Sequence, residues 1–274
     1  MNLTFFAQPP YLHEGKNRLM GGSALIRGEQ IAKYLGAKYN PVSGYENDIC
    51  VYIKPEMKRD ATPSHPFAEK SYIDVIDYKE YIQWLRDNPA LRGIVASQYS
   101  YDILKKYKLP NKIVFIPQQH CNFERMVRDR KIIKNVGIIG APRTFQYSID
   151  ELSDRLKEIG LTLITKYDFQ TREDVVNFYK QIDIQLVWDT IYRLLKNPLK
   201  IINAGSFGIP TVGYPHKGYR EVEGYYVRAS TVDQLVNEAE KLINLENYEI
   251  ASKDLLQMAE KYHISRVAEM YKLL

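Results

Sequence analysis

Short runs of apolar residues alternate along the chain with longer segments in which apolar residues recur every three or four positions. The short runs predict buried β-strands, and the longer segments predict helices with one apolar face. Strands and helices that alternate in this way form a parallel sheet covered by helices. In the first half the expected strands are 3–7, 48–53, 71–77, 93–97 and 112–117, and the expected helices are 24–36, 78–88 and 99–109.

The same pattern starts again after a basic, polar stretch from Gln118 to Lys134. The expected strands of the second half are 135–142, 161–165, 182–188, 209–215 and 224–229, and the expected helices are 148–160, 172–181, 198–207, 231–245 and about 248–274. We therefore predict an α/β protein with two Rossmann-like domains, 1–133 and 134–274, that face each other across a cleft. In open α/β sheets the ligand binds beyond the carboxyl ends of the strands, so the loops there are where function is expected.

The first expected helix has recognisable ends. Ser23 is a candidate N-cap, and Gly36 is a candidate stop. Its expected apolar stripe consists of Leu25, Ile31, Tyr34 and Leu35.

Composition describes a globular protein with a sizeable core. The chain has 274 residues, of which 45% are hydrophobic and 26% charged. Nothing approaches the roughly 18 consecutive apolar residues of a membrane helix, and the first residues lack the basic region of a secretory signal. Cys50 and Cys121 lie far apart, which indicates neither a disulfide framework nor a zinc site. We expect a cytoplasmic protein, with peripheral binding to the inner membrane face left open.

The charge is mildly positive, with a formal net charge of +5. It suits an anionic ligand such as a nucleoside diphosphate, an anionic membrane or nucleic acid. A solvated, lysine-rich surface would give the same value.

The most informative segment is residues 197–227. Lys200 falls in the first turn of the expected helix, beside backbone N–H groups that favour an anion. Asn203 follows three residues later, on the same helix face. Gly208 ends the helix, and a strand and a loop that contains Glu221 come next.

This segment resembles the second domain of glycosyltransferases of the GT-B type, especially the retaining group called family four. That family has a Pro-x-Lys helix with Ala and Gly, then a Pro-Val-Val strand, a glycine loop and a Glu. The matching positions here are Pro198, Lys200, Ala204, Gly208, Pro210 and Glu221. Weaker resemblance reaches back to about residue 92, and it implies that the final helix packs back on the first domain.

The chain departs from the family at three places. The family commonly has Glu where this chain has Asn203, and Glu again where it has Leu195. Asp189 or Arg193 are candidates for a role related to that of the second Glu. The family's Asn-Gly-x-Asp is replaced by residues 118–123.

Glycosyl transfer requires that the charge of the leaving diphosphate be stabilised and that the acceptor hydroxyl be positioned. Arg143, in the loop after strand 135–142, and Lys200 are our candidates for the first task, with the backbone N–H groups at Gly21 and Gly22. Glu221, Asn203 and Asp189 are candidates for binding the donor's sugar or ribose. The resemblance implies a metal-independent hexosyltransferase that uses a nucleoside diphosphate sugar as donor and retains configuration.

An inverting enzyme would require a general base, for which His13, His120 and His216 are candidates. The sequence has no P-loop, no G-x-G-x-x-G and no Asp-x-Asp motif, so we expect no metal and no cofactor beyond the donor.

The sequence leaves three alternatives for the acceptor: a glycan, a lipid-linked sugar or a hydroxymethylated DNA base. The alternatives to a transferase are a sugar-nucleotide epimerase or hydrolase, and a divergent, non-catalytic protein that binds nucleotide sugars.

Overall fold

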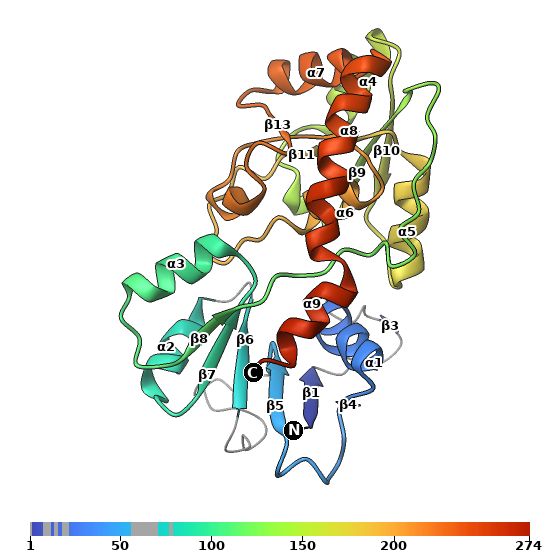
Figure 1. The fold of residues 1–274 in the computed structure, drawn as a ribbon. Coiled ribbons are helices and arrows are strands. Elements are labelled where there is room, and N and C mark those ends of the chain that lie inside the picture. Colours follow the sequence, from blue (N-terminus) through green and yellow to red (C-terminus); the bar gives the residue numbers. More distant parts are fainter. Residues whose placement is uncertain (1, 8–11, 14–15, 18–21, 56–70, 77–78) are drawn as a thin grey trace. The chain divides into compact units, whose positions relative to one another are not determined.

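The computed structural model describes residues 2–7, 12–13, 16–17, 22–55, 71–76 and 79–274. The chain divides into two compact units, each built on its own parallel sheet with helices (Figure 1). The first unit comprises 1–119, 193–197 and 264–274, and the second comprises 120–192 and 198–263. The predicted α/β architecture of two Rossmann-like halves is confirmed. The cleft that we expect between them stays a prediction.

The first unit has a six-stranded parallel sheet in the order β4-β1-β5-β6-β7-β8. Its strands are β1 (Leu3–Ala7), β4 (Lys38–Tyr39), β5 (Ile49–Ile53), β6 (Ser71–Val75), β7 (Arg92–Val95) and β8 (Ile113–Phe115), with β2 (Leu12–His13) and β3 (Lys16–Asn17) forming a separate antiparallel pair. Its helices are η1 (Ala24–Gln30), α1 (Ile31–Leu35), α2 (Glu80–Asp87), α3 (Gln98–Lys106) and α9 (Ile264–Tyr271). β5 and β6 are buried along their whole length, as expected for central strands of a parallel sheet.

The first helix differs from its prediction. Ser23 already has helical backbone angles and its side chain caps nothing, so its prediction as N-cap is wrong. The predicted stop at Gly36 is confirmed, since this residue has a φ of +65°. Residues Ala24–Gln30 form a π-helix, whose wider turn breaks the three-to-four spacing of the predicted stripe. Tyr34 is exposed as a result, whereas Arg27 points inward.

Arg27 is completely buried and makes an ion pair with the equally buried Asp74 of β6. It also donates a hydrogen bond to the carbonyl of Ile116 (3.0 Å). A charge in a protein core is tolerated only when it is paired in this way.

The second unit has a five-stranded parallel sheet in the order β10-β9-β11-β12-β13. The strands are β9 (Asn135–Ile139), β10 (Thr162–Lys166), β11 (Ile184–Val187), β12 (Thr211–Gly213) and β13 (Val227–Arg228). The helices are η2 (Pro142–Thr144), α4 (Ile149–Glu158), α5 (Arg172–Gln181), α6 (Leu199–Ser206), η3 (Lys217–Val222), α7 (Val232–Lys241), α8 (Leu245–Ala259) and η4 (Glu260–Tyr262).

Two hydrophobic clusters lie on opposite faces of this sheet. Side chains of α4 and α7 pack against Val136, Ile138 and their neighbours, and side chains of α5 and α6 pack against Ile139. α8 runs along α6 (Figure 1) and closes a third cluster with it. Gly137 allows α5 to approach β9, because a Cβ there would lie 2.5 Å from the Ile182 side chain and 2.7 Å from that of Phe178.

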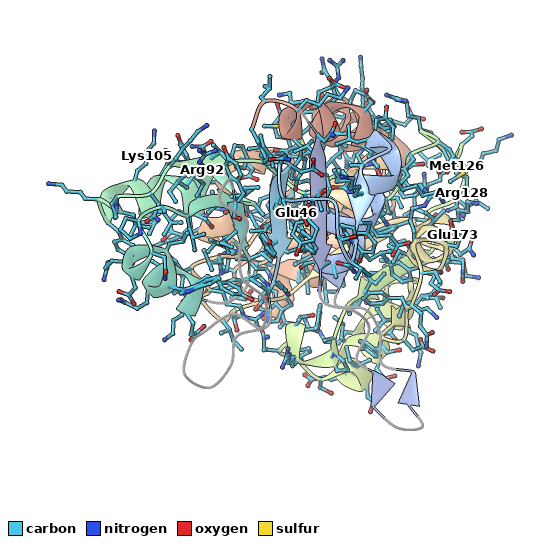
Figure 2. The ribbon with its side chains drawn as sticks, turned by 90° about the horizontal axis from the view of Figure 1, so that it is seen from below. Glu46, Arg92, Lys105, Met126, Arg128 and Glu173 are labelled. Carbon is cyan, nitrogen blue, oxygen red and sulfur yellow. The ribbon has the colours of Figure 1, made fainter. Side chains whose placement is uncertain are left out.

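The boundary between the units falls after Gln119 rather than after residue 133. Residues 120–134 belong to the second unit because their polar groups bond to it: Asn122 donates to the carbonyl of Ser206 (2.7 Å), and Asp183 accepts from the backbone of Lys134 (3.0 Å). Met126 packs on the cluster that includes α5. Arg128, whose side chain lies at the surface (Figure 2), donates to the carbonyl of Lys180 in the last turn of that helix (2.9 Å). The basic, polar composition of residues 118–134 suggested a separation between the halves, but residues 120–134 are hydrogen-bonded to the second unit.

The C-terminal stretch, predicted as one helix, is two. The backbone of Tyr262 and His263 turns between α8 and α9, and α9 belongs to the first unit. There Tyr271 meets the ring of Phe5 edge-on (5.4 Å), and α9 lies beside α1 (Figure 1). The family resemblance implies this placement of the final helix.

Candidate functional site

The strand order of the second unit indicates where its ligand site lies. β9 is paired with β10 on one side and with β11 on the other, so the chain runs outward from β9 to β10 and then crosses back past β9 to β11. At such a point the loops that follow β9 and β11 turn away from each other and leave a crevice beyond the carboxyl ends of these two strands. The loops that follow β9 and β11, residues 140–148 and 188–192, therefore frame the candidate site of the second unit.

Lys200 enters this region from the first turn of α6. Its ammonium donates a hydrogen bond to Thr144 Oγ1 (3.0 Å), in the loop after β9. A Cβ at Gly140 would lie only 2.8 Å from the same ammonium, and Gly140 has a φ of +125°, which an L side chain rarely adopts. The absence of a side chain at Gly140 therefore makes room for the side chain of Lys200.

Gln146 ties the two loops together. Its backbone N–H donates to the carbonyl of Trp188 (3.1 Å), and its side-chain oxygen accepts from the backbone of Thr190 (2.7 Å). Its amide nitrogen donates to the carbonyl of Arg143 (2.7 Å). One side chain therefore fixes the loop that carries Arg143 against the loop that carries Asp189.

The start of α6 is anchored from within the sheet. Gln185 of β11 is fully buried, and its amide donates to the carbonyl of Lys200 (3.0 Å) while its oxygen accepts from the Tyr179 hydroxyl (2.7 Å). Thr144, Gln146 and Gln185 were not among the predicted site residues. A glutamine in β11, whose other three residues are apolar, is the signal that would have identified Gln185.

The other candidates near these loops differ in exposure. Arg143 is exposed, in η2, so its guanidinium is available to a ligand. Asp189 is only 1% exposed and lies two residues beyond β11. Glu221 is half-buried in η3. Burial, and then the charge of Glu221, raise the pKa of Tyr262. Their roles in donor binding stay predictions.

The side chain of Asn203 makes a hydrogen bond within the protein. It is buried, and its side-chain oxygen accepts the backbone N–H of Cys121 (2.9 Å). The family's Glu at this position is expected to hold the ribose, whereas this Asn fastens α6 to the segment that follows Gln119. A contact with the donor stays a prediction for Asn203.

The histidines have mainly structural surroundings. His120 and His263 are both buried, with ring centres 5.4 Å apart. Burial, and then the neighbouring His263, lower the pKa of His120 to about 3, and its Nδ1 accepts the backbone N–H of Asn122 (3.2 Å). A base with so low a pKa is poorly matched to catalysis near neutral pH.

His216, in the loop after β12, is also buried, and its Nδ1 accepts the backbone N–H of Gly218 (2.9 Å). The side chain of His13 lies outside the described residues.

Some of the predicted site residues of the first unit lie outside the part of the chain that the structure describes. Gly21 lies outside it, and Gly22 is exposed with no atom near the place where a Cβ would be. Arg193 is half-buried and, with Leu195, belongs to the first unit. Leu195 is part of that unit's hydrophobic core.

Among the described residues, no group of three or more His, Cys, Asp or Glu side chains is arranged to hold a metal ion. The expectation of metal independence stays a prediction. Within the same residues, no helix has both the length and the apolar character that crossing a membrane requires.

Neither a protein-family model nor a curated protein sequence matches this chain. Solved structures do match it in fold. The structure of Anabaena HepE in complex with UDP and glucose has a TM-score of 0.64 at 10% identity, with 100% of this chain and 99% of that chain covered. A glycosyltransferase from Rickettsia africae has a TM-score of 0.64 at 9% identity, with 99% and 97% covered.

Other matches are to longer proteins. TarM has a TM-score of 0.59 at 11% identity, and the match covers 83% of this chain but 54% of that one. The chain thus spans about half the length of TarM, of the matched chain of a GtfA/B complex (52%) and of the pneumococcal transferase GtfA (52%). All of these neighbours are of the GT-B type. The chain therefore has the GT-B fold.

Proposed function

We propose that this protein is a glycosyltransferase that moves a sugar from a nucleoside diphosphate sugar to an acceptor hydroxyl. The observation that carries the proposal is the position of Lys200, at the start of α6 and hydrogen-bonded across to Thr144, in the crevice where an α/β sheet binds its ligand. The neighbouring GT-B structures, among them one in complex with UDP and glucose, support it.

In the proposed reaction the bond between the sugar's anomeric carbon and the diphosphate oxygen breaks, and the acceptor oxygen forms the new bond. Negative charge grows on the diphosphate as it leaves. The Lys200 ammonium and the exposed Arg143 guanidinium stabilise that charge, together with N–H groups in the first turn of α6. The acceptor's proton leaves with the nucleoside diphosphate or a base.

The finer parts of the proposal come from the family resemblance. We propose retention of configuration, no requirement for a metal, and a glycan, a lipid-linked sugar or hydroxymethylated DNA as acceptor. Two free, buried cysteines are compatible with a reducing compartment, so we propose the cytoplasm, with or without peripheral contact to the membrane.

The test of activity is release of nucleoside diphosphate from UDP-, GDP- and ADP-sugars, measured with and without a panel of acceptors. A transferase releases nucleoside diphosphate faster with one acceptor and gives a glycosylated product. Release that no acceptor accelerates would instead indicate a hydrolase, and interconversion of the sugar without release would indicate an epimerase.

Two observations favour a second candidate, a non-catalytic protein that binds nucleotide sugars. At Leu195, where the family has a sugar-facing Glu, this chain has a leucine packed in the core of the first unit. Asn203, in place of the second Glu, is bonded to the backbone of Cys121. Such a protein would bind nucleotide without turnover.

A further inference from the structure

An aromatic stack rises from the core of the second unit to its surface, beside the candidate site. Its base is Tyr219, which is buried, and its middle is His216, whose ring centre lies 5.4 Å from that of Tyr219. Tyr192 forms the top: its ring is nearly parallel to that of His216, at 13° and 6.0 Å, and it is 57% exposed.

The stack joins two of the loops that follow the carboxyl ends of the strands. Tyr192 lies in the loop after β11, and His216 lies in the loop after β12. Trp188 and Tyr214, from the same two loops, meet edge-on at 5.3 Å. The Lys200 site lies in the adjoining loops after β9 and β11, so the stack flanks it along the sheet edge.

The stack is also held rigid. His216 Nδ1 accepts the N–H of Gly218 (2.9 Å), so the imidazole cannot turn without loss of a hydrogen bond. The carbonyl of His216 accepts the N–H of Tyr219 (2.8 Å), which fixes the backbone between these two residues. The ammonium of Lys217 lies over the Tyr192 ring, 5.9 Å from its centre. An exposed, flat ring on a fixed support is suited to a ligand that has an apolar face and polar edges.

We propose that Tyr192 is a binding residue for the transferred sugar ring of the donor. This inference rests on the proposed function. A sugar ring presents C–H bonds on its faces and hydroxyls at its edges, and the positively polarised C–H groups pack on the negative face of an aromatic ring. The sugar is bonded directly to the diphosphate, and neighbouring strands are about 4.8 Å apart, so a sugar ring reaches the loops next to the Lys200 site.

The test is the affinity of the full chain for matched pairs: UDP and UDP-glucose, GDP and GDP-mannose, ADP and ADP-glucose. For the pair that the unaltered protein binds, we expect Tyr192→Leu to weaken binding of the sugar conjugate about 5- to 10-fold. Binding of the free nucleoside diphosphate should change less than about twofold. Tyr192→Phe keeps the ring and should bind both ligands as the unaltered protein does.

Two further variants separate stacking from structure. His216→Asn keeps a side-chain acceptor for the N–H of Gly218 but removes the ring below Tyr192, so it should give a smaller loss for the sugar conjugate alone. Tyr34→Leu replaces a tyrosine that is 49% exposed on α1 of the other unit and should change neither affinity.

The outcomes distinguish this inference from the function on which it rests. If the unaltered protein binds no member of any pair, the proposed function fails. If it binds a pair and Tyr192→Leu binds the sugar conjugate equally well, the inference alone is overturned. Equal weakening of the nucleotide and its sugar conjugate also overturns it, because the ring would then stack on the nucleobase.

Discussion

Lys200 and Thr144 are joined by a 3.0 Å hydrogen bond between their side chains, which connects the first turn of α6 to the loop after β9. The lysine therefore has a fixed position before any ligand arrives. Thr144 in turn donates to the carbonyl of Ala141 (2.7 Å), so the support of the ammonium is itself anchored. A preorganised cation of this kind stabilises developing charge without having to reorganise during the reaction.

Removal of the Lys200 ammonium should weaken binding of a nucleoside diphosphate. A hydrogen bond to a charged group contributes about 1.5–3 kcal/mol, so we expect Lys200→Met to raise the dissociation constant roughly 10- to 150-fold in titration calorimetry. Lys157→Met, which alters an exposed lysine of α4 in the same unit, is the matched control and should have no effect. Equal affinities of the Lys200 and Lys157 variants would contradict the assignment.

Gly140→Ala should damage both stability and binding. The φ of +125° strains any L side chain, at a cost of about 1–3 kcal/mol, and the new Cβ would lie 2.8 Å from the Lys200 ammonium. We expect a lower urea midpoint and a nucleotide affinity reduced toward that of Lys200→Met. A variant with unaltered affinity would show that the lysine position is not set by this glycine.

Gly22→Ala tests the predicted role of the glycine pair in the first unit. Gly22 has no atom near the position of a Cβ and is exposed, so alanine should leave the free energy of unfolding within about 0.5 kcal/mol. If the backbone there approaches the diphosphate, the same variant should bind the nucleotide sugar less tightly. Unchanged affinity would remove Gly22 from the site.

The buried ion pair of the first unit should be essential to its stability. Arg27→Met leaves the Asp74 carboxylate buried without its cation, and Asp74→Leu leaves the guanidinium without its anion. Each should cost about 3–5 kcal/mol in urea unfolding, and the double variant should cost less than the sum of the two. A loss below about 1 kcal/mol for either single variant would contradict the pairing.

Stability should fall as the pH is lowered below about 6.5, because His120 resists protonation in the folded state. Its pKa is about 3 when folded and 6.5 ordinarily, so between these values the unfolded chain binds the proton and the folded chain does not. The favourable contribution of the neutral ring is thus complete above pH 6.5 and is lost toward pH 3. Between pH 6.5 and 5 the expected loss is about 1.5 kcal/mol.

The surroundings of His120 determine how this measurement is made. Glu260 and Arg125 form an ion pair with each other and shift the pKa of His120 in opposite directions, Glu260 upward and Arg125 downward. The ring of His263 lies against that of His120. Urea midpoints at pH 6.5 and 5 should therefore be compared with those of His120→Asn, which keeps an acceptor for the N–H of Asn122. An equally large pH effect in that variant would show that another group is responsible.

The sequence was sufficient for most of the strands and helices and for their order, because apolar periodicity reports which faces are buried. It placed Lys200 in the first turn of its helix, where the structure also has it. It did not indicate that Arg27 turns inward, since a π-helix changes the spacing on which the prediction depended. Nor did it indicate that Asn203 binds the backbone of Cys121, because that contact joins residues 82 positions apart.

The two loops of the candidate site show the same limit. Thr144 and Gln146 look like ordinary loop residues in the sequence, and their importance comes from partners on α6 and in the loop after β11. Sequence patterns describe local structure well, whereas the pairing of loops depends on the order of strands in the sheet. Strand order became available only with the structure.

The most direct test of the account is a thermal-shift panel of UDP, GDP, ADP and CMP with their common sugar conjugates, run on the unaltered protein and on Lys200→Ala. A ligand that binds only the folded state raises the Tm by mass action. The account predicts a rise with one nucleotide and its sugar conjugate that is lost in Lys200→Ala. No rise with any of them, or an equal rise in the variant, would contradict a donor site at Lys200.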